Sequence, residues 1–444
     1  MREALSTFTN TIDPVLRAMS ERVLIITVGT GRNREDIARS LAENSIGYHN
    51  PDRILLFGSS KSNEETVPFL RKFAAERFAE RFDPPYAFDD FNNVSRLFEN
   101  YRQTVQEQVL DAGVHPEDVY VDFTSGTKPM SAALVLTASH LGLGRLLYVS
   151  GQQRDAGGRA RPGTEMAVPS QMRSFRYQEA LRQFRQLFNA HRYQAAREVI
   201  EQTQKANLDV GSPEETALFD RLAHFYAAWD GLDLDEALTA EDKLTTEDVP
   251  ELKQKVSKAF GNAVYHHPNQ IVGRILNEPY SALRMADLVE NAERRFRQGS
   301  YADAMLRLYR GMEYLAQFQL YHQHNHIETG DVNLAKLPED LRDAYAEKGP
   351  ADDTISLSML NAYRLLRDLE DPLGMQFMQA YDKKKSDLTR LLNKRNHSVL
   401  AHGFQPVRKR DYEDLRDTFV VPLAQDYIPD FAKRRADVRF PTFG

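Results

Sequence analysis

Cysteine is absent from this chain of 444 residues, and tryptophan occurs only once. Without thiols the protein can form neither disulfides nor thiolate metal sites. Long apolar runs are missing as well, because Gly, His or Arg interrupts each of them well before the roughly 20 residues that a membrane span requires. Glu3, Asp13 and Arg17 argue against a secretory signal peptide. We therefore expect a cytoplasmic protein.

An excess of positive charge is also lacking, since the formal net charge is -7. A protein coated in nucleic acid would be basic, so any contact with RNA must be local. The composition is otherwise that of a globular chain, with 41% hydrophobic and 27% charged residues. Over this length we expect about two to four domains, each burying its own core.

The first part of the chain alternates between short apolar runs and helical patterns. The apolar runs occupy residues 23–28, 53–57, 118–123 and 145–149. Helical patterns lie between them and include residues 91–110 and 130–141. This alternation predicts an α/β domain with a Rossmann-like, mostly parallel, doubly wound sheet. Ligands of such sheets bind at the carboxyl ends of the strands.

Each predicted strand ends in a loop of small, hydroxyl-bearing or basic residues. These are Gly29, Thr30, Gly31 and Arg32; Ser59, Ser60 and Lys61; Thr124, Ser125, Gly126, Thr127 and Lys128; and Ser150 and Gly151. Pro129 suits a first helical position, so the free amides of residues 125–128 would point outward at the positive end of a helix dipole. A phosphate fits such a site, although the same residues could simply cap a helix.

The usual nucleotide-binding fingerprints are incomplete. Gly29 and Gly31 supply two glycines of a dinucleotide fingerprint, but Arg34 occupies the third position and no acidic residue follows the second strand. An ordinary P-loop is excluded because Lys128 is followed by Pro129. The residues predict a phosphate cradle without a metal or a catalytic base, which suits a sensor better than an enzyme.

Two segments carry a resemblance to a known family. Residues 27–31 and 124–130 resemble the CARF domain of type III CRISPR systems, and the likeness covers roughly the first 170 residues. CARF domains bind cyclic oligoadenylate across a symmetric dimer, so the resemblance implies a homodimer and this activator, with no cofactor. It assigns the loop residues above, together with Pro129 and Met130, to the ligand. Residues 152–163 carry Arg154, Arg159 and Arg161 and could close over the ring or form a surface loop.

Beyond residue 170 the strand patterns stop and helices follow. They are expected at residues 175–189, 192–205, 214–230 and 301–321. We predict three domains: a CARF-like domain over residues 1–170, an all-α connecting domain over 171–280 and an all-α C-terminal domain over 281–444. The connecting domain shows no residues that suggest chemistry.

A possible active-site motif lies near the C-terminus. Residues 387–401 continue a helical pattern, and in one continuous helix Arg395 and His402 share a face, about 10.5 Å apart along the axis. Gly403 could end this helix. The separation is long for a single phosphate, unless the helix breaks near Ser398 or a second chain brings its own pair.

This motif resembles the active site of the HEPN family of metal-independent ribonucleases, with six residues between arginine and histidine. The resemblance implies that a dimer places two such pairs in one cleft, where the 2′-hydroxyl of RNA attacks its own phosphate. His402 would transfer a proton, Arg395 would grip the phosphate, and Asn396 and His397 would assist. Three basic residues that flank the motif would contact the RNA backbone: Lys394, Arg390 and Arg408.

The two resemblances together predict a cyclic oligoadenylate-activated, metal-independent endoribonuclease of type III CRISPR antiviral defence that cleaves single-stranded RNA. No DNA or membrane partner is expected. One rival is a non-catalytic sensing scaffold in which Arg395 and His402 are structural. A further possibility is that the N-terminal site cleaves its own ring ligand with the help of Lys128.

A histidine-rich segment superficially resembles a metal site. It contains His322, His324 and His326 near Asp331. The segment is a polar loop without dependable ligand spacing, so no metal is expected there.

Overall fold

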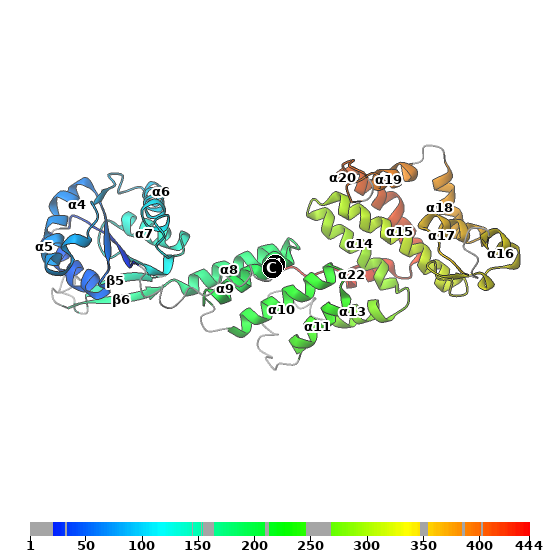
Figure 1. The fold of residues 1–444 in the computed structure, drawn as a ribbon, viewed down its shortest axis with the longest axis horizontal. Helices are drawn as coiled ribbons and strands as arrows, with labels where there is room; N and C mark the ends of the chain where they lie inside the picture. Colours follow the sequence, from blue (N-terminus) through cyan, green and yellow to red (C-terminus); the bar gives the residue numbers. More distant parts are fainter. Residues whose placement is uncertain are drawn as a thin grey trace, which may run out of the picture. The chain divides into compact units, whose positions relative to one another are not determined.

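The computed structural model describes residues 21–31, 33–143, 145–151, 153, 164–208, 213–245, 268–346, 354–383, 387–400 and 403–444. The chain forms two compact units, Met1–Gln178 and Glu179–Gly444 (Figure 1). Each unit is described separately below.

The first unit contains a sheet of six strands in the order β3-β2-β1-β4-β5-β6. The strands are β1 (Val23–Thr27), β2 (Arg53–Gly58), β3 (Tyr86–Ala87), β4 (Val119–Asp122), β5 (Arg145–Gly151) and β6 (Glu165–Gln171). All neighbours run parallel except β6, which is antiparallel to β5. The predicted mostly parallel α/β fold is confirmed, as are its four strands.

Two strands escaped the sequence analysis. β3 has only two residues, too few to show a periodic pattern. β6 contains Pro169, and proline argues against a strand because it cannot donate a ladder hydrogen bond. It is tolerated here because β6 lies at the edge of the sheet.

Helices cover both faces of this sheet. They are α2 (Arg34–Ser40), η1 (Leu41–Ile46), α3 (Gly47–His49), α4 (Ser60–Glu65), α5 (Val67–Phe78), η2 (Ala79–Arg81), α6 (Val94–Val105), η3 (Gln106–Leu110), η4 (Pro116–Asp118) and α7 (Lys128–His140). Val23 and Ile25 face the core formed with α6 and α7, while Leu24 and Ile26 face the core formed with α2 and α5. This alternation follows from the two-residue period of a strand and explains why β1 is buried throughout.

The second unit is helical, as predicted. Its helices are α8 (Arg173–Asn189, which begins in the first unit), α9 (Tyr193–Lys205), α10 (Pro213–Asp230), α11 (Leu234–Thr245), α13 (Pro268–Asn277), α14 (Ala282–Arg297), α15 (Tyr301–Gln323), η5 (Leu334–Lys336), α16 (Glu339–Ala346), α17 (Met359–Asp368), α18 (Pro372–Asp382), α19 (Asp387–Asn396), α20 (Lys409–Leu415), η6 (Arg416–Val420), α21 (Val421–Tyr427) and α22 (Phe431–Asp437). A small antiparallel pair, β7 (Val332–Asn333) with β8 (Thr354–Ile355), is an addition that the sequence did not predict.

Helices α14 and α15 pack against each other, and α15 also contacts α17, α18, α19 and α20. Leu308, Met312 and Leu315 of α15 are fully buried, so this helix forms the centre of the C-terminal core. It therefore supports α19, which carries the predicted catalytic arginine. None of the helices that the structure describes is both long and apolar enough to cross a bilayer.

Candidate functional site

A cavity of about 1040 Å³ opens beyond the ends of β1, β4 and β5. Its lining comes from the loop after β1, the start of α2, the loop after β4 and the end of β5. The residues are Gly29, Thr30, Gly31, Asn33, Arg34, Asp36, Ile37, Ser40, Leu41, Thr124, Ser125, Gly126, Thr127, Val149, Gly151 and Glu165. The cavity thus lies at the strand ends where the alternating pattern placed a ligand site.

The two loops that form the cavity floor are locked together by glycine and by hydroxyl groups. A Cβ on Gly29 would lie 2.8 Å from the Cα of Gly126, and Gly126 itself has a φ of +91°. The Thr27 hydroxyl donates to the Ser125 carbonyl at 2.6 Å, and the Gly29 amide donates to the Ser125 hydroxyl at 3.2 Å. The close approach of the two backbones therefore requires glycine at position 29, and the positive φ favours glycine at position 126.

The start of α7 resembles the predicted anion site with two corrections. Thr127 is the N-cap, so Pro129 is the second helical residue and not the first. The Thr127 amide donates to the sulfur of Met130 at 3.5 Å and is not free. In the described part of the chain the amides of Gly126 and Lys128 make no hydrogen bond, so they remain available at the positive end of the helix.

Several predicted ligand residues are not in the cavity lining. Ser59 caps α4 through a reciprocal bond with Ser62, and Ser60 donates its amide and its hydroxyl to Asp89. Met130 is buried and fills the space beneath Gly126. Also outside the lining are Lys61, Lys128, Pro129 and Ser150. Arg32 and the arginines of the 154–163 loop lie outside the described residues.

The first turn of α2 supplies lining residues that the sequence analysis missed. Asn33 precedes α2 but does not cap it with its side chain, which donates to the Asp36 carboxylate at 3.1 Å. Arg34 pairs with Glu65 at 2.9 Å, and Glu165 lines the cavity from β6. The lining is therefore mixed in charge and not purely basic. The position of α2 directly after the glycine loop was the available signal, because helix starts line such sites.

Asp122 lies below the cavity at the end of β4 and is fully buried. Its Oδ1 accepts from the Thr124 amide at 2.7 Å, and the Thr124 hydroxyl in turn accepts from the Val149 amide at 2.7 Å. Burial raises the pKa of the Asp122 carboxyl above 3.8, while the bonds from Thr124 oppose that shift. A single buried carboxyl thus holds the Thr124 loop against β5.

Replacing Asp122 by asparagine should change how stability depends on pH. Because its pKa is raised in the folded state, the folded protein binds this proton more tightly than the unfolded chain. Its contribution to the free energy of unfolding therefore declines as the pH rises from about 3.9 through the folded pKa. Asp122→Asn should remove that decline, so the variant should gain stability relative to the wild-type protein as the pH rises. Urea unfolding at several pH values would measure this, and parallel curves for both proteins would contradict it.

The C-terminal motif begins on α19, where Arg395 lies against α15. Its guanidinium carbon is 4.0 Å from the centre of the Tyr309 ring, and its Nη1 donates to Oδ1 of Asn396 at 3.0 Å. Burial raises the pKa of the Tyr309 hydroxyl, and the positive charge of Arg395 acts in the opposite direction and lowers it. The Nε of Arg395 is buried without a hydrogen-bond partner among the described residues. The arginine is thus fixed by ring stacking and retains unused donors.

The helix ends at Asn396, so the prediction of one continuous helix through Ala401 is wrong. The chain turns back near Ser398, the break that had remained an alternative, and Gln405 donates its amide to the His397 carbonyl at 2.8 Å. Gly403 does not cap this helix, because α19 already ends at Asn396. A Cβ on Gly403 would lie only 2.4 Å from the His397 carbonyl oxygen. Glycine is therefore required for the close approach of the two sides of this loop. His402 lies outside the described residues.

The remaining residues of the motif vary in their surroundings. His397 is exposed, and its Nδ1 bonds the Asn393 carbonyl at 2.8 Å. Arg390 is within 3.6 Å of carboxylates of Asp387, Asp411 and Asp414, so its charge is largely compensated. Lys394 is half-buried and Arg408 is exposed just before α20. Arg390 is therefore less suited to RNA contact than the sequence suggested.

Three exposed apolar side chains lie on the same loop, which the sequence analysis had not noted. Val399 is 64% exposed, Leu400 50% and Phe404 94%. Large apolar side chains grouped on one exposed turn are typical of a surface that another molecule covers.

The three side chains of the histidine-rich segment do not point toward a common site. His324 bonds Asp371 at 2.8 Å, His322 bonds the Tyr280 carbonyl at 3.1 Å, and the His326 ring contacts Tyr321. In the part of the chain that the structure describes, no group of three potential ligand residues could hold a metal ion.

In comparisons with known proteins, two family models match the helical part of the chain. A family model of the Csm6 6H domain matches residues 177–269, and a model of the Csm6 HEPN domain matches residues 274–425. The fold is similar to a solved structure of Enterococcus italicus Csm6 bound to cyclic hexa-2′-fluoro-hexa-dAMP, with a TM-score of 0.54 and 13% identity over 95% of this chain and 99% of that chain. A search of curated protein sequences gives no significant match.

Proposed function

The chain belongs to the Csm6 family of CRISPR-associated ribonucleases, and on that premise we propose that it is an endoribonuclease switched on by cyclic oligoadenylate. The observation that carries the proposal is the order of parts: a strand-end cavity in the first unit, followed by Csm6 6H and HEPN domains. We place the domains at residues 1–170, 171–280 and 281–444, and the protein acts in the cytoplasm.

The activator binds in the N-terminal cavity. Gly29 lets the loops after β1 and β4 approach each other closely, and the free amides at the start of α7 suit phosphate oxygens. Enterococcus italicus Csm6, which shares this fold, was solved with a cyclic hexanucleotide, and this supports a ring ligand here. Lys128 directly follows Thr127 of the cavity lining and can contribute long-range attraction.

RNA cleavage takes place at the C-terminal motif without metal. Arg395 grips the scissile phosphate with the donors that Tyr309 and Asn396 leave free. The 2′-hydroxyl loses its proton to solvent as it attacks the phosphate, and His402 donates a proton to the leaving 5′-oxygen. Asn396 orients the arginine, and His397 assists. Lys394 and Arg408 contact the backbone of single-stranded RNA. The products carry 2′,3′-cyclic phosphate and 5′-hydroxyl ends.

Two chains form the active homodimer. In the second unit, Val399, Leu400 and Phe404 expose apolar surface directly beside the motif. In the first unit, Tyr148, Met166 and Val168 expose apolar surface on β5 and β6. Surfaces of this kind are energetically costly in water and are typical of faces that pair. Dimerisation brings two copies of the motif into one cleft.

The chemistry is tested with RNA that carries one 2′-deoxynucleotide at the mapped cleavage site, in EDTA and with activator present. We expect cleavage to stop at that position and continue at unmodified positions. His402→Ala should lower the rate by about 10²–10⁴-fold. Cleavage at the deoxy position, or undiminished activity of His402→Ala, would contradict the assignment of these residues. Absence of ring-stimulated cleavage in the wild-type protein would favour the scaffold alternative.

Ring size is tested with cyclic tetraadenylate and cyclic hexaadenylate, each with a fluorescent RNA reporter. A time course of each ring with the protein, read by chromatography, also detects ring cleavage. Loss of ring while Arg395 and His402 are both replaced would assign that cleavage to the N-terminal cavity.

A further inference from the structure

The C-terminal tail of the chain completes the core of the connecting domain. After α22, residues 438–444 return to α8–α10 (Figure 1). The Phe443 ring packs against Phe184, Phe188 and Phe219, and its amide and carbonyl both bond the Asn189 side chain, at 2.7 and 2.9 Å. Residues 438–444 of the tail lie beyond both family-model matches. The nuclease domain is thus tied to the connecting domain at its far end.

Phe440 of the same tail lies between the two domains. Its ring centre is 4.6 Å from that of Trp229 in α10, and the guanidinium carbon of Arg294 in α14 is 3.7 Å from it. Trp229 is only 2% exposed. Nearby, the Gln298 side chain after α14 donates to the His191 carbonyl at 2.8 Å. Tilted aromatic packing and a cation–π contact therefore hold the tail, α10 and α14 together.

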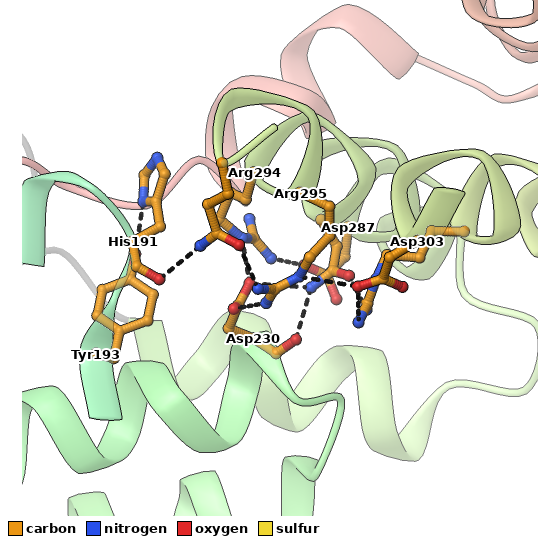
Figure 2. Close-up of polar contacts among 10 residues, drawn as sticks. His191, Tyr193, Asp230, Asp287, Arg294, Arg295 and Asp303 are labelled. Carbon is orange, nitrogen blue, oxygen red and sulfur yellow. Dashed lines mark hydrogen bonds and ion pairs between the residues drawn. The ribbon is translucent and has the colours of Figure 1, made fainter. Parts of the chain in front are cut away.

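A buried ionic cluster joins the same helices (Figure 2). Asp230 is the last residue of α10 and is 4% exposed. The helix dipole disfavours a negative charge at this end, so the carboxylate needs other partners. Its Oδ1 accepts from Arg294 Nε at 2.7 Å and Asn291 Nδ2 at 3.2 Å, and Arg295 pairs with its Oδ2. Asn291 also donates to the Asp230 carbonyl at 2.8 Å. Three residues of α14 therefore converge on the last residue of α10.

The contacts continue from this cluster to the proposed catalytic arginine. Asn291 accepts a hydrogen bond from Arg307 of α15, and Arg307 is paired with Asp303 at 3.0 Å. Arg295 also approaches Asp303, at 3.7 Å. Tyr309, whose ring supports Arg395, is two residues beyond Arg307 on the same helix. A movement of α10 against α14 would therefore reach Arg395 through a single helix.

We propose that this joint, formed by Asp230, Asn291, Arg294, Arg295 and residues 438–444, positions Arg395 in response to the activator. The inference rests on the proposed function and adds the element that couples the connecting domain to the nuclease. A buried cluster of ion pairs suits the coupling of two domains because it has a few discrete arrangements and does not deform gradually. The joint residues are positioning residues, since none of them touches RNA.

Asp230→Asn tests the joint, with Asp220→Asn as the matched control. Asp220 lies on the same helix and pairs with Arg197 at 3.1 Å, but this pair is confined to the connecting domain. We expect the ratio of stimulated to unstimulated RNA cleavage to fall about tenfold in Asp230→Asn, a typical allosteric coupling. The ratio should stay within about twofold in Asp220→Asn, and ring affinity should stay within about twofold in both.

Trp229 provides a second readout that does not depend on any variant. It is the single tryptophan of the chain and is buried, so a ligand in the N-terminal cavity cannot touch it. We expect its emission to change as cyclic tetraadenylate or hexaadenylate is added, at the concentrations that stimulate cleavage. Phe440→Leu keeps an apolar side chain but removes the ring beside Trp229. It should reduce both the change in Trp229 emission and the stimulation of RNA cleavage.

The outcomes separate the two proposals. Normal stimulation of Asp230→Asn together with constant Trp229 emission in the wild-type protein would overturn the joint and leave the proposed function standing. Absence of ring-stimulated cleavage in the wild-type protein would overturn the proposed function and this inference with it.

Discussion

Arg395→Ala should lower ring-stimulated RNA cleavage by about 10²–10³-fold, the usual cost of removing a charge-stabilising donor from a transition state. Arg395 is half-buried, stacked on Tyr309 and bonded to Asn396, so the side chain is preorganised before substrate arrives. A permanent, forked charge held in this way suits a phosphate whose negative charge grows during attack. Single-turnover cleavage of a labelled RNA measures the effect.

Arg395→Lys distinguishes the fork from the charge alone. Lysine keeps the positive charge but cannot make a bidentate grip, so we expect its rate to remain at least about tenfold below wild type. Arg274→Ala is the control, because Arg274 is exposed on α13 and pairs only locally with Glu278 at 2.9 Å. If Arg395→Ala and Arg274→Ala cleave at similar rates, Arg395 is structural.

Gly29→Ala should weaken binding of cyclic oligoadenylate by about 100-fold, which corresponds to about 2.8 kcal/mol. The new Cβ would lie 2.8 Å from the Cα and 2.9 Å from the nitrogen of Gly126, and backbone atoms cannot move aside as a flexible side chain can. The two loops must therefore separate, which disrupts the bonds of Ser125 with Thr27 and Gly29. Isothermal titration with the ring measures the affinity.

Gly273→Ala is the matched control for this substitution. A Cβ at Gly273, on α13, meets nothing within 4 Å, so the ring should bind with unchanged affinity. Circular dichroism of both variants establishes that each is folded. An affinity of Gly29→Ala within about twofold of wild type would show that the ring does not use these loops.

The fold of the first unit was largely readable from sequence because its central strands are buried on both faces. Such strands appear as continuous apolar runs, and their loops at one sheet edge follow from the parallel topology. The sequence did not predict that Ser59 and Ser60 lie outside the cavity lining, where Ser59 caps α4 and Ser60 bonds Asp89. Small hydroxyl residues after a strand serve as helix caps as readily as they serve a phosphate, so their type alone could not decide.

The C-terminal features depended on contacts that periodicity cannot reveal. The end of α19 is set by the turn that packs Gly403 on His397, and a local helical pattern ran on past it. Asp230 and Arg294 are 64 positions apart, and Asn189 and Phe443 are 254 apart. Such long-range pairs form only when the whole unit folds, which is why the joint was invisible in the sequence.

The most direct test of the account compares initial rates of RNA cleavage by the full chain in EDTA, with and without a saturating ring. Cyclic tetraadenylate and hexaadenylate are both used, and titration calorimetry establishes which of them is bound. We predict that the bound ring raises the rate at least about tenfold. Equal rates with the ring bound and without it would contradict the claim that the N-terminal cavity controls the C-terminal ribonuclease.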